Sequence, residues 1–178
     1  MYSDLDYISK WDSTPDVCSY NFSSSTTFGS LFNAAKTHAI NQWSNAGISL
    51  NSLSSFDSYA DIIIFGGTLD YLNNTIGLSI GDDADGITYF NASQQYVIMY
   101  GAITKVGKVF TDTVSVFIID NTRNCSSQNY ISSTATHELG HALGWMGHAP
   151  SGNVMYAYSN SVTILQNPDK LHLYQYYH

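Results

Sequence analysis

Apolar residues recur at helical spacing in three segments of the chain. In the first, residues 28–45, one face of the predicted helix carries Leu31, Ala34, Ala35, Ala39 and Trp43. Thr26 or Thr27 is suited to cap this helix, and Gly47 is suited to end it. His38 lies on or beside the apolar face, where a packing role is favoured over metal binding.

Two shorter helices are predicted at residues 132–143 and from Pro168, with Asn167 as cap, to about residue 177. Segments rich in β-branched and aromatic residues predict strands at residues 18–22, 48–53, 60–65, 76–80, 87–91, 96–100 and 114–119. The unbroken apolar centre of the third segment suits a strand that is covered on both faces. No internal repeat or linker interrupts the chain, so we predict one mixed α+β domain over residues 1–178.

Composition and charge narrow the classes of function. The 178-residue chain has a formal net charge of −8 at pH 7, a pI near 4.8 and a single arginine, Arg123. Because it has no basic stripe, we expect neither a nucleic-acid partner nor binding to an anionic membrane surface. No apolar run reaches the roughly 20 residues of a membrane span. Low charge with abundant Ser, Asn, Thr and Tyr favours a secreted, extracellular protein, which we expect to be a monomer.

Candidate chemistry is concentrated in the segment HELGHALGWMGH, which starts at His137. Residues four apart lie on one face of a helix, so the imidazoles of His137 and His141 can converge on one cation. For zinc, each nitrogen would lie about 2.0–2.1 Å from the ion. His148 can join them only if the chain turns sharply after His141. Gly144 suits that turn, because glycine enters left-handed backbone space without a Cβ penalty.

The chain's only glutamate, Glu138, lies within this segment. Three nitrogen ligands leave a fourth position for water, and a catalytic zinc lowers the pKa of that water toward about 7. Glu138 points about 100° away from His137 on the helix, so it is placed to act as general base and then as proton donor to a leaving amine. The alternatives are a solvated helix whose histidines bind no metal, and a closed structural zinc site, which would need a fourth protein ligand.

The metzincin clan of zinc endopeptidases has the extended motif His-Glu-x-x-His-x-x-Gly-x-x-His, which the chain resembles at His137, Glu138, His141, Gly144 and His148. Residues 152–156 resemble the methionine turn of that clan, in which Met155 would form a hydrophobic floor beneath the metal. The short connector between His148 and Met155 is most similar to that of the matrixin branch, the relatives of matrix metalloproteinases.

This resemblance implies a zincin-like α+β fold. The fold would have a twisted mixed sheet of about five strands, a long N-terminal helix, an active-site helix and a C-terminal helix. The resemblance also implies a zinc-dependent endopeptidase acting on proteins or peptides, with one catalytic Zn²⁺ and an inhibitory propeptide. It places the substrate-binding edge strand at residues 76–79. The 45 residues between Asn91 and His137 exceed what a minimal matrixin uses, which predicts an extra hairpin.

Two other classes of function stay open at this point. One is a binding module that holds zinc but has lost turnover, against which the intact Glu138 argues. The other is a zinc hydrolase that acts on an amide other than a peptide bond.

Two further features carry predictions of their own. Asp82, Asp83 and Asp85, set between flexible glycines, could wrap Ca²⁺ with carboxylate oxygens, or they could form a solvated acidic turn. Cys18 and Cys125 are the only cysteines. In an oxidising compartment they would most simply form a disulfide, and the alternative is a thiolate that caps the zinc as a fourth ligand.

Overall fold

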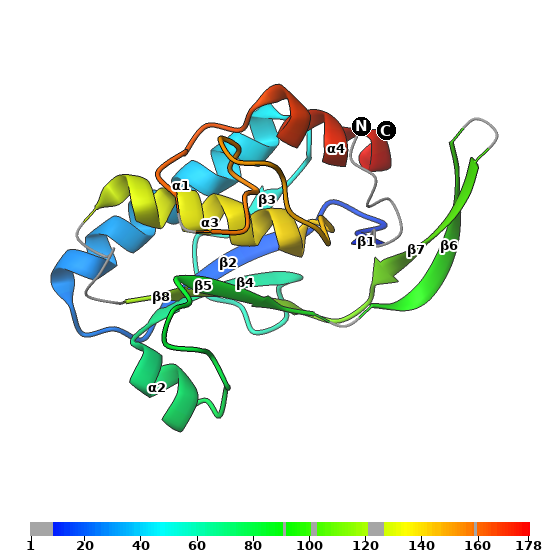
Figure 1. Cartoon of the computed structure of the whole chain (residues 1–178). Coiled ribbons are helices and arrows are strands. Elements are labelled where there is room, and N and C mark those ends of the chain that lie inside the picture. The colour runs from blue at the N-terminus through cyan, green and yellow to red at the C-terminus, as the bar shows by residue number, and fades with distance from the viewer. Residues whose placement is uncertain (1–8, 91, 101–102, 121–126, 159) are drawn as a thin grey trace.

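The computed structural model describes residues 9–90, 92–100, 103–120, 127–158 and 160–178. At its centre lies a five-stranded sheet, with helices α1 (Thr26–Asn45) and α3 (Gln128–Ala142) on one face (Figure 1). The short helix α2 (Leu69–Asn74) lies on the other face. The larger hydrophobic core fills the space between the sheet and the two long helices. The predicted α+β class and mixed sheet of about five strands are therefore confirmed.

The five-stranded sheet is parallel except at one edge. Its order is β3 (Asn51–Ser52), β2 (Asp16–Asn21), β4 (Ile62–Gly67), β8 (Val114–Ile119) and β5 (Gly86–Tyr89). Only β5 is antiparallel to its neighbour, β8. In β8, Val116 and Ile118 enter the larger core, whereas Phe117 and Ile119 pack in a second apolar cluster with Leu72 of α2. Both faces of β4 and β8 are covered, which explains their continuous apolar sequences.

A second sheet contains the predicted extra hairpin. Its order is β1 (Ser9–Lys10), β7 (Ile103–Phe110) and β6 (Ala92–Tyr100). Strands β6 and β7 pair antiparallel, and Figure 1 shows the hairpin extending away from the five-stranded sheet. The predicted strand at residues 96–100 lies within β6, whereas β7 is not among the predicted strands.

Helix α1 forms close to where the apolar pattern predicts it. Its cap is Ser25 and neither of the two predicted threonines, because the Ser25 hydroxyl accepts a hydrogen bond from the Phe28 N–H at 3.1 Å. Gly47, with φ of 92°, follows its end as expected. The indole of Trp43 donates to the carbonyl of Thr136 at 2.9 Å, which ties α1 to α3.

The other helices agree with the predicted segments within a few residues. Helix α3 begins four residues earlier than predicted, and α4 (Asn167–Tyr177) is capped by Gln166, with Asp169 completing a capping box. Helix α2 is not among the predicted elements. None of the helices within the described residues is long and apolar enough to cross a bilayer.

Two strand predictions are wrong in extent or in kind. Residues 76–80 form no strand, because the side chain of Asn73 bonds both the N–H and the carbonyl of Ile80, each at 2.9 Å. Those bonds satisfy backbone groups that a neighbouring strand would otherwise pair. The segment 48–53 contributes only β3. The antiparallel edge strand is instead β5, which overlaps the prediction at residues 87–91.

Candidate metal centre

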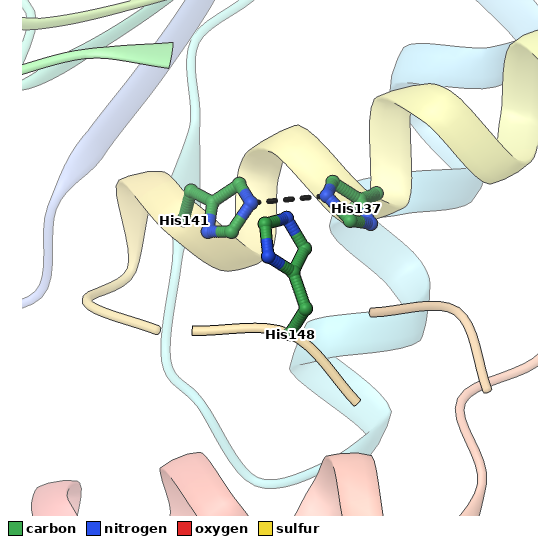
Figure 2. Close-up of side chains that lie close together, drawn as sticks. All are labelled: His137, His141 and His148. Carbon is green, nitrogen blue, oxygen red and sulfur yellow. Dashed lines mark hydrogen bonds between the residues drawn. The ribbon is translucent and has the colours of Figure 1, made fainter. Parts of the chain in front are cut away.

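Helix α3 brings His137 and His141 together, one turn apart on the same face. Their ring centroids are 4.6 Å apart, and their Nε2 atoms are 3.0 Å apart (Figure 2). The spacing of four residues places both side chains on one face of the helix.

Gly144 turns the chain back so that His148 can reach the other two rings. Its φ is +109°, in the region that favours glycine, and a Cβ there would lie 1.7 Å from the carbonyl oxygen of Ser9. After this turn, the His148 ring lies 5.3 Å from that of His137 and 5.2 Å from that of His141, measured between centroids. In Figure 2 the three rings point toward a common centre. The sharp turn predicted from Gly144 is confirmed.

The three histidines form a group that could hold a metal ion, since one ring nitrogen from each lies within 4.8 Å of the others. Within the part of the chain that the structure describes, no other set of three His, Cys, Asp or Glu side chains meets this criterion. The carboxylates of Asp82, Asp83 and Asp85 are therefore not gathered in this way, and calcium binding there stays a prediction.

The outer nitrogens of the two helical histidines are held by backbone carbonyls. Nδ1 of His137 donates to the carbonyl of Val154 at 2.9 Å, and Nδ1 of His141 donates to the carbonyl of Trp145. Because a carbonyl only accepts, each Nδ1 carries the ring proton and each Nε2 carries a lone pair. These carbonyls also fix the orientation of the rings, as partners of metal-binding histidines commonly do.

The electrostatics of the trio favour a cation. Burial lowers the pKa of His137 and of His141 to about 4, so that both rings are neutral near pH 7. Burial also lowers the pKa of His148. The two Nε2 atoms lie at hydrogen-bond distance, 3.0 Å (dashed line in Figure 2). With both Nδ1 atoms protonated, neither neutral ring has a proton to place between them, so the position suits a cation. The donor set therefore fits a divalent ion that prefers imidazole nitrogen, such as zinc.

The methionine segment lies against α3, where the Val154 carbonyl meets the ring of His137 and the Met155 sulfur lies close to Gly140. Met155 is fully buried, and a Cβ added to Gly140 would lie 2.5 Å from its sulfur. The segment is tied to α4, because Oδ2 of Asp169 accepts from the N–H groups of Val154 at 3.4 Å and Gln166 at 2.9 Å. Val154 thus connects α4 to the ring of His137.

Glu138 lies beside the trio and is almost completely buried, with 8% of its surface exposed. The hydroxyl of Thr88, on β5, is 2.7 Å from its Oε2 and 3.0 Å from its backbone carbonyl. Burial raises the pKa of the Glu138 carboxyl, while His137 and the hydrogen bond from Thr88 act to lower it. The carboxyl therefore sits in an environment that favours taking up a proton.

The three histidines, Glu138 and Thr88 all line one cavity of about 560 Å³. Strand β5 forms one side through Gly86 and Thr88, and the other side is formed by Tyr156, Ala157, Tyr158 and Asn160. The second side is braced by the Ser133 hydroxyl of α3, which donates to the side chain of Asn160 at 2.9 Å. The cavity is large enough to enclose a small ligand or several residues of a peptide.

Comparison with known proteins adds no further identification: no family model and no curated protein sequence matches the chain. The site is accordingly defined by its own geometry.

Sequence reasoning identified the histidines, Glu138 and Met155, and the structure places them in one region. It did not identify Thr88, Asp169 or the two carbonyl groups. Thr88 precedes Glu138 by 50 residues, and carbonyl groups are present at every position, so no local pattern distinguishes these partners. Only the pairing of β5 with β8 beneath α3 brings Thr88 to the site.

The predicted disulfide and the role of His38 have separate outcomes. Cys18 is buried and has no disulfide partner within the described residues, and its thiol donates to the carbonyl of Asp57 at 3.3 Å. Cys125 lies outside the described residues, so its pairing with Cys18 stays a prediction. His38 bonds the carbonyl of Thr163 at 2.7 Å through Nε2, in agreement with a packing role.

Proposed function

We propose that the chain is a zinc-dependent endopeptidase of the metzincin type, which hydrolyses peptide bonds in proteins. One observation carries the proposal: three inward-facing imidazoles and the only glutamate of the chain lie in the wall of the same cavity. The resemblance of the histidine motif and of the methionine segment supports the same assignment. We further propose that the protein is secreted, and that a propeptide covers the cavity before activation.

His137, His141 and His148 would hold the zinc through Nε2. Zinc bound to three neutral imidazoles supplies Lewis acidity, which polarises a carbonyl group and makes water more acidic. The carbonyls of Val154 and Trp145 keep the two helical rings in the tautomer that binds metal.

Glu138 would move the proton. Its carboxylate takes a proton from the attacking water and delivers it to the nitrogen of the departing amine, which is the role of a general base and then a general acid. A raised pKa suits this sequence, because the carboxyl must hold the proton between the two steps.

Strand β5 would bind the substrate. It stands at the edge of the sheet and forms one side of the cavity, so an extended peptide can add to it through backbone hydrogen bonds. Such binding makes few demands on side chains, which is consistent with an enzyme that acts on proteins.

Incubation of the zinc-loaded protein with a denatured protein substrate tests the proposal. We expect cleavage that a chelator abolishes and that added zinc restores. Glu138→Ala should retain one zinc per chain and lose cleavage. A protein that binds zinc but never cleaves would instead be a binding module, and cleavage that survives Glu138→Ala would refute the assigned mechanism.

A further inference from the structure

The edge strand β5 approaches helix α3 unusually closely at Glu138. A Cβ added to Gly86 would lie 2.7 Å from Cγ2 of Thr134 and 2.9 Å from Cγ of Glu138, distances that real Cβ contacts essentially never reach. A strand with any other residue at this position would have to move away from the helix. Gly86 therefore lets the side chains that follow it in β5 reach Glu138.

Thr88 is the next residue of β5 that faces α3, since side chains alternate between the two sides of a strand. It lies opposite Val116 of β8, which belongs to the core beneath the helix. Its hydroxyl is 2.7 Å from Oε2 of Glu138 and 3.0 Å from the carbonyl oxygen of the same residue. Because Thr88 is β-branched, its χ1 rotation is restricted, and the hydroxyl is held in one direction.

Because of this contact, the two carboxylate oxygens of Glu138 have different surroundings. Among the described residues, Thr88 is the only side chain that donates a hydrogen bond to the carboxylate, and it does so at Oε2. Oε1 receives no such bond, and Glu138 lines the cavity beside the histidines. One oxygen is thus anchored to the sheet, while the other is left for a reacting water.

We propose that Thr88 is the positioning residue for Glu138, which it anchors from the substrate-binding edge of the sheet. The inference rests on the function proposed above. Without the anchor, the carboxylate could rotate about its side-chain bonds and would spend only part of its time directed at the water. Since β5 would also bind the peptide, one strand would position both the substrate and the carboxylate of Glu138.

A purely structural role for Thr88 makes a different prediction. If the hydroxyl merely tied β5 to α3, its loss would lower the melting temperature and weaken substrate binding. The turnover of bound substrate would be unaffected. A positioning role lowers kcat and leaves KM nearly unchanged.

The first test needs no activity, because Glu138 is the only glutamate in the chain. Selective ¹³C labelling of the glutamate carboxyl gives a single carboxylate signal in the NMR spectrum. We expect Thr88→Val to shift this signal and Thr88→Ser to leave it close to the wild-type position. The matched control is Thr113→Val, which removes a 3.0 Å hydrogen bond from a threonine hydroxyl to the carbonyl of Ala60. A Thr88→Val signal at the wild-type position would overturn the proposal.

The second test is steady-state cleavage of a peptide by the zinc-loaded variants. Thr88→Val should lower kcat about tenfold and change KM by less than about twofold, which corresponds to the loss of one hydrogen bond to a charged group. Thr88→Ser should recover most of that loss, and Thr113→Val should match the wild type. Zinc content and melting temperature are measured for each variant, so that misfolding is recognised.

The two tests separate failure of the inference from failure of the proposed function. Normal kcat in Thr88→Val, beside an active wild type, would refute the positioning role alone. An inactive wild type whose glutamate signal still responds to Thr88→Val would refute the endopeptidase and uphold the contact. If Thr88→Val raises KM and leaves kcat unchanged, Thr88 has a structural role and the inference is overturned.

Discussion

His137 and His141 are held in a different way from His148. The two helical rings are each fixed by the backbone of α3 and by a hydrogen bond from Nδ1 to a carbonyl, and both are half-buried. The third ring follows a turn, is exposed, and makes no hydrogen bond with the described residues. Two of the three nitrogens are therefore preorganised, and the third depends on the path of a loop.

This comparison shows which of the three ligands are oriented before a metal binds. A ligand that is already oriented costs little conformational entropy when a metal binds, whereas a loop-borne ligand must be ordered at that moment. The loop is in turn held by distant contacts, in which Gly144 packs on Ser9 and the N–H of Ala149 donates to the carbonyl of Met155 at 2.6 Å. Substitution of the loop ligand and substitution of a helical ligand should therefore weaken zinc binding by different amounts.

The largest effect should come from removing a helical ligand. Total zinc-binding free energies of about 10–16 kcal/mol, shared among the ligands, predict that His137→Ala weakens zinc binding about a thousandfold. His148→Ala should weaken it about a hundredfold, because the loss of the loop ligand also removes the cost of ordering the loop. Competition with a chromophoric chelator measures both affinities. Equal losses in the two variants would contradict the proposed difference in preorganisation.

The next effect concerns the turn that carries His148. Gly144→Ala should destabilise the protein by about 3 kcal/mol, since it combines positive φ with a collision against Ser9. Gly152→Ala is the matched control, because Gly152 has φ of +90° but no atom within 4 Å of an added Cβ. That control should cost only about 1 kcal/mol. Urea denaturation measures both, and similar losses would show that packing against Ser9 does not hold the turn.

The smallest effect concerns Asp169, whose bond to Val154 supports the carbonyl that orients His137. Burial raises the pKa of Asp169, so the folded protein binds its proton more tightly than the unfolded chain does. The contribution of Asp169 to stability is therefore fully present below the ordinary pKa of an aspartate, and it declines as the pH rises through the raised value.

Asp169→Asn should remove this pH dependence and lie within about 1 kcal/mol of the wild type at pH 7, because an amide oxygen can accept the same backbone bonds. Unfolding free energies of the two proteins, compared between pH 3 and pH 7, test the sign. As the pH falls, the unfolding free energy of the wild type should rise relative to that of the variant. A difference that stays constant with pH would refute the account of Asp169.

Local sequence patterns were sufficient for the parts of the site that depend on helix spacing and backbone conformation. The four-residue step places His137 and His141 together, and the left-handed φ of Gly144 produces the turn that the third histidine requires. Strands β4 and β8 were also recognisable, since burial on both faces leaves continuous apolar runs.

Side-chain contacts between different segments account for what the sequence pattern missed. The β-branched residues near Ile76 suit a strand, but the Asn73 side chain takes the backbone bonds of Ile80 that a strand would use. The link from Thr88 to Glu138 and the link from Asp169 to Val154 join separate elements. Such links depend on packing, which spacing along the chain does not encode.

Anomalous diffraction from crystals grown with one equivalent of zinc tests the central claim most directly. The account predicts a single strong peak about 2.0–2.1 Å from Nε2 of His137, His141 and His148, with no fourth side chain bound to it. Zinc located elsewhere, or a trio whose rings turn away from the ion, would contradict the assignment of the metal centre.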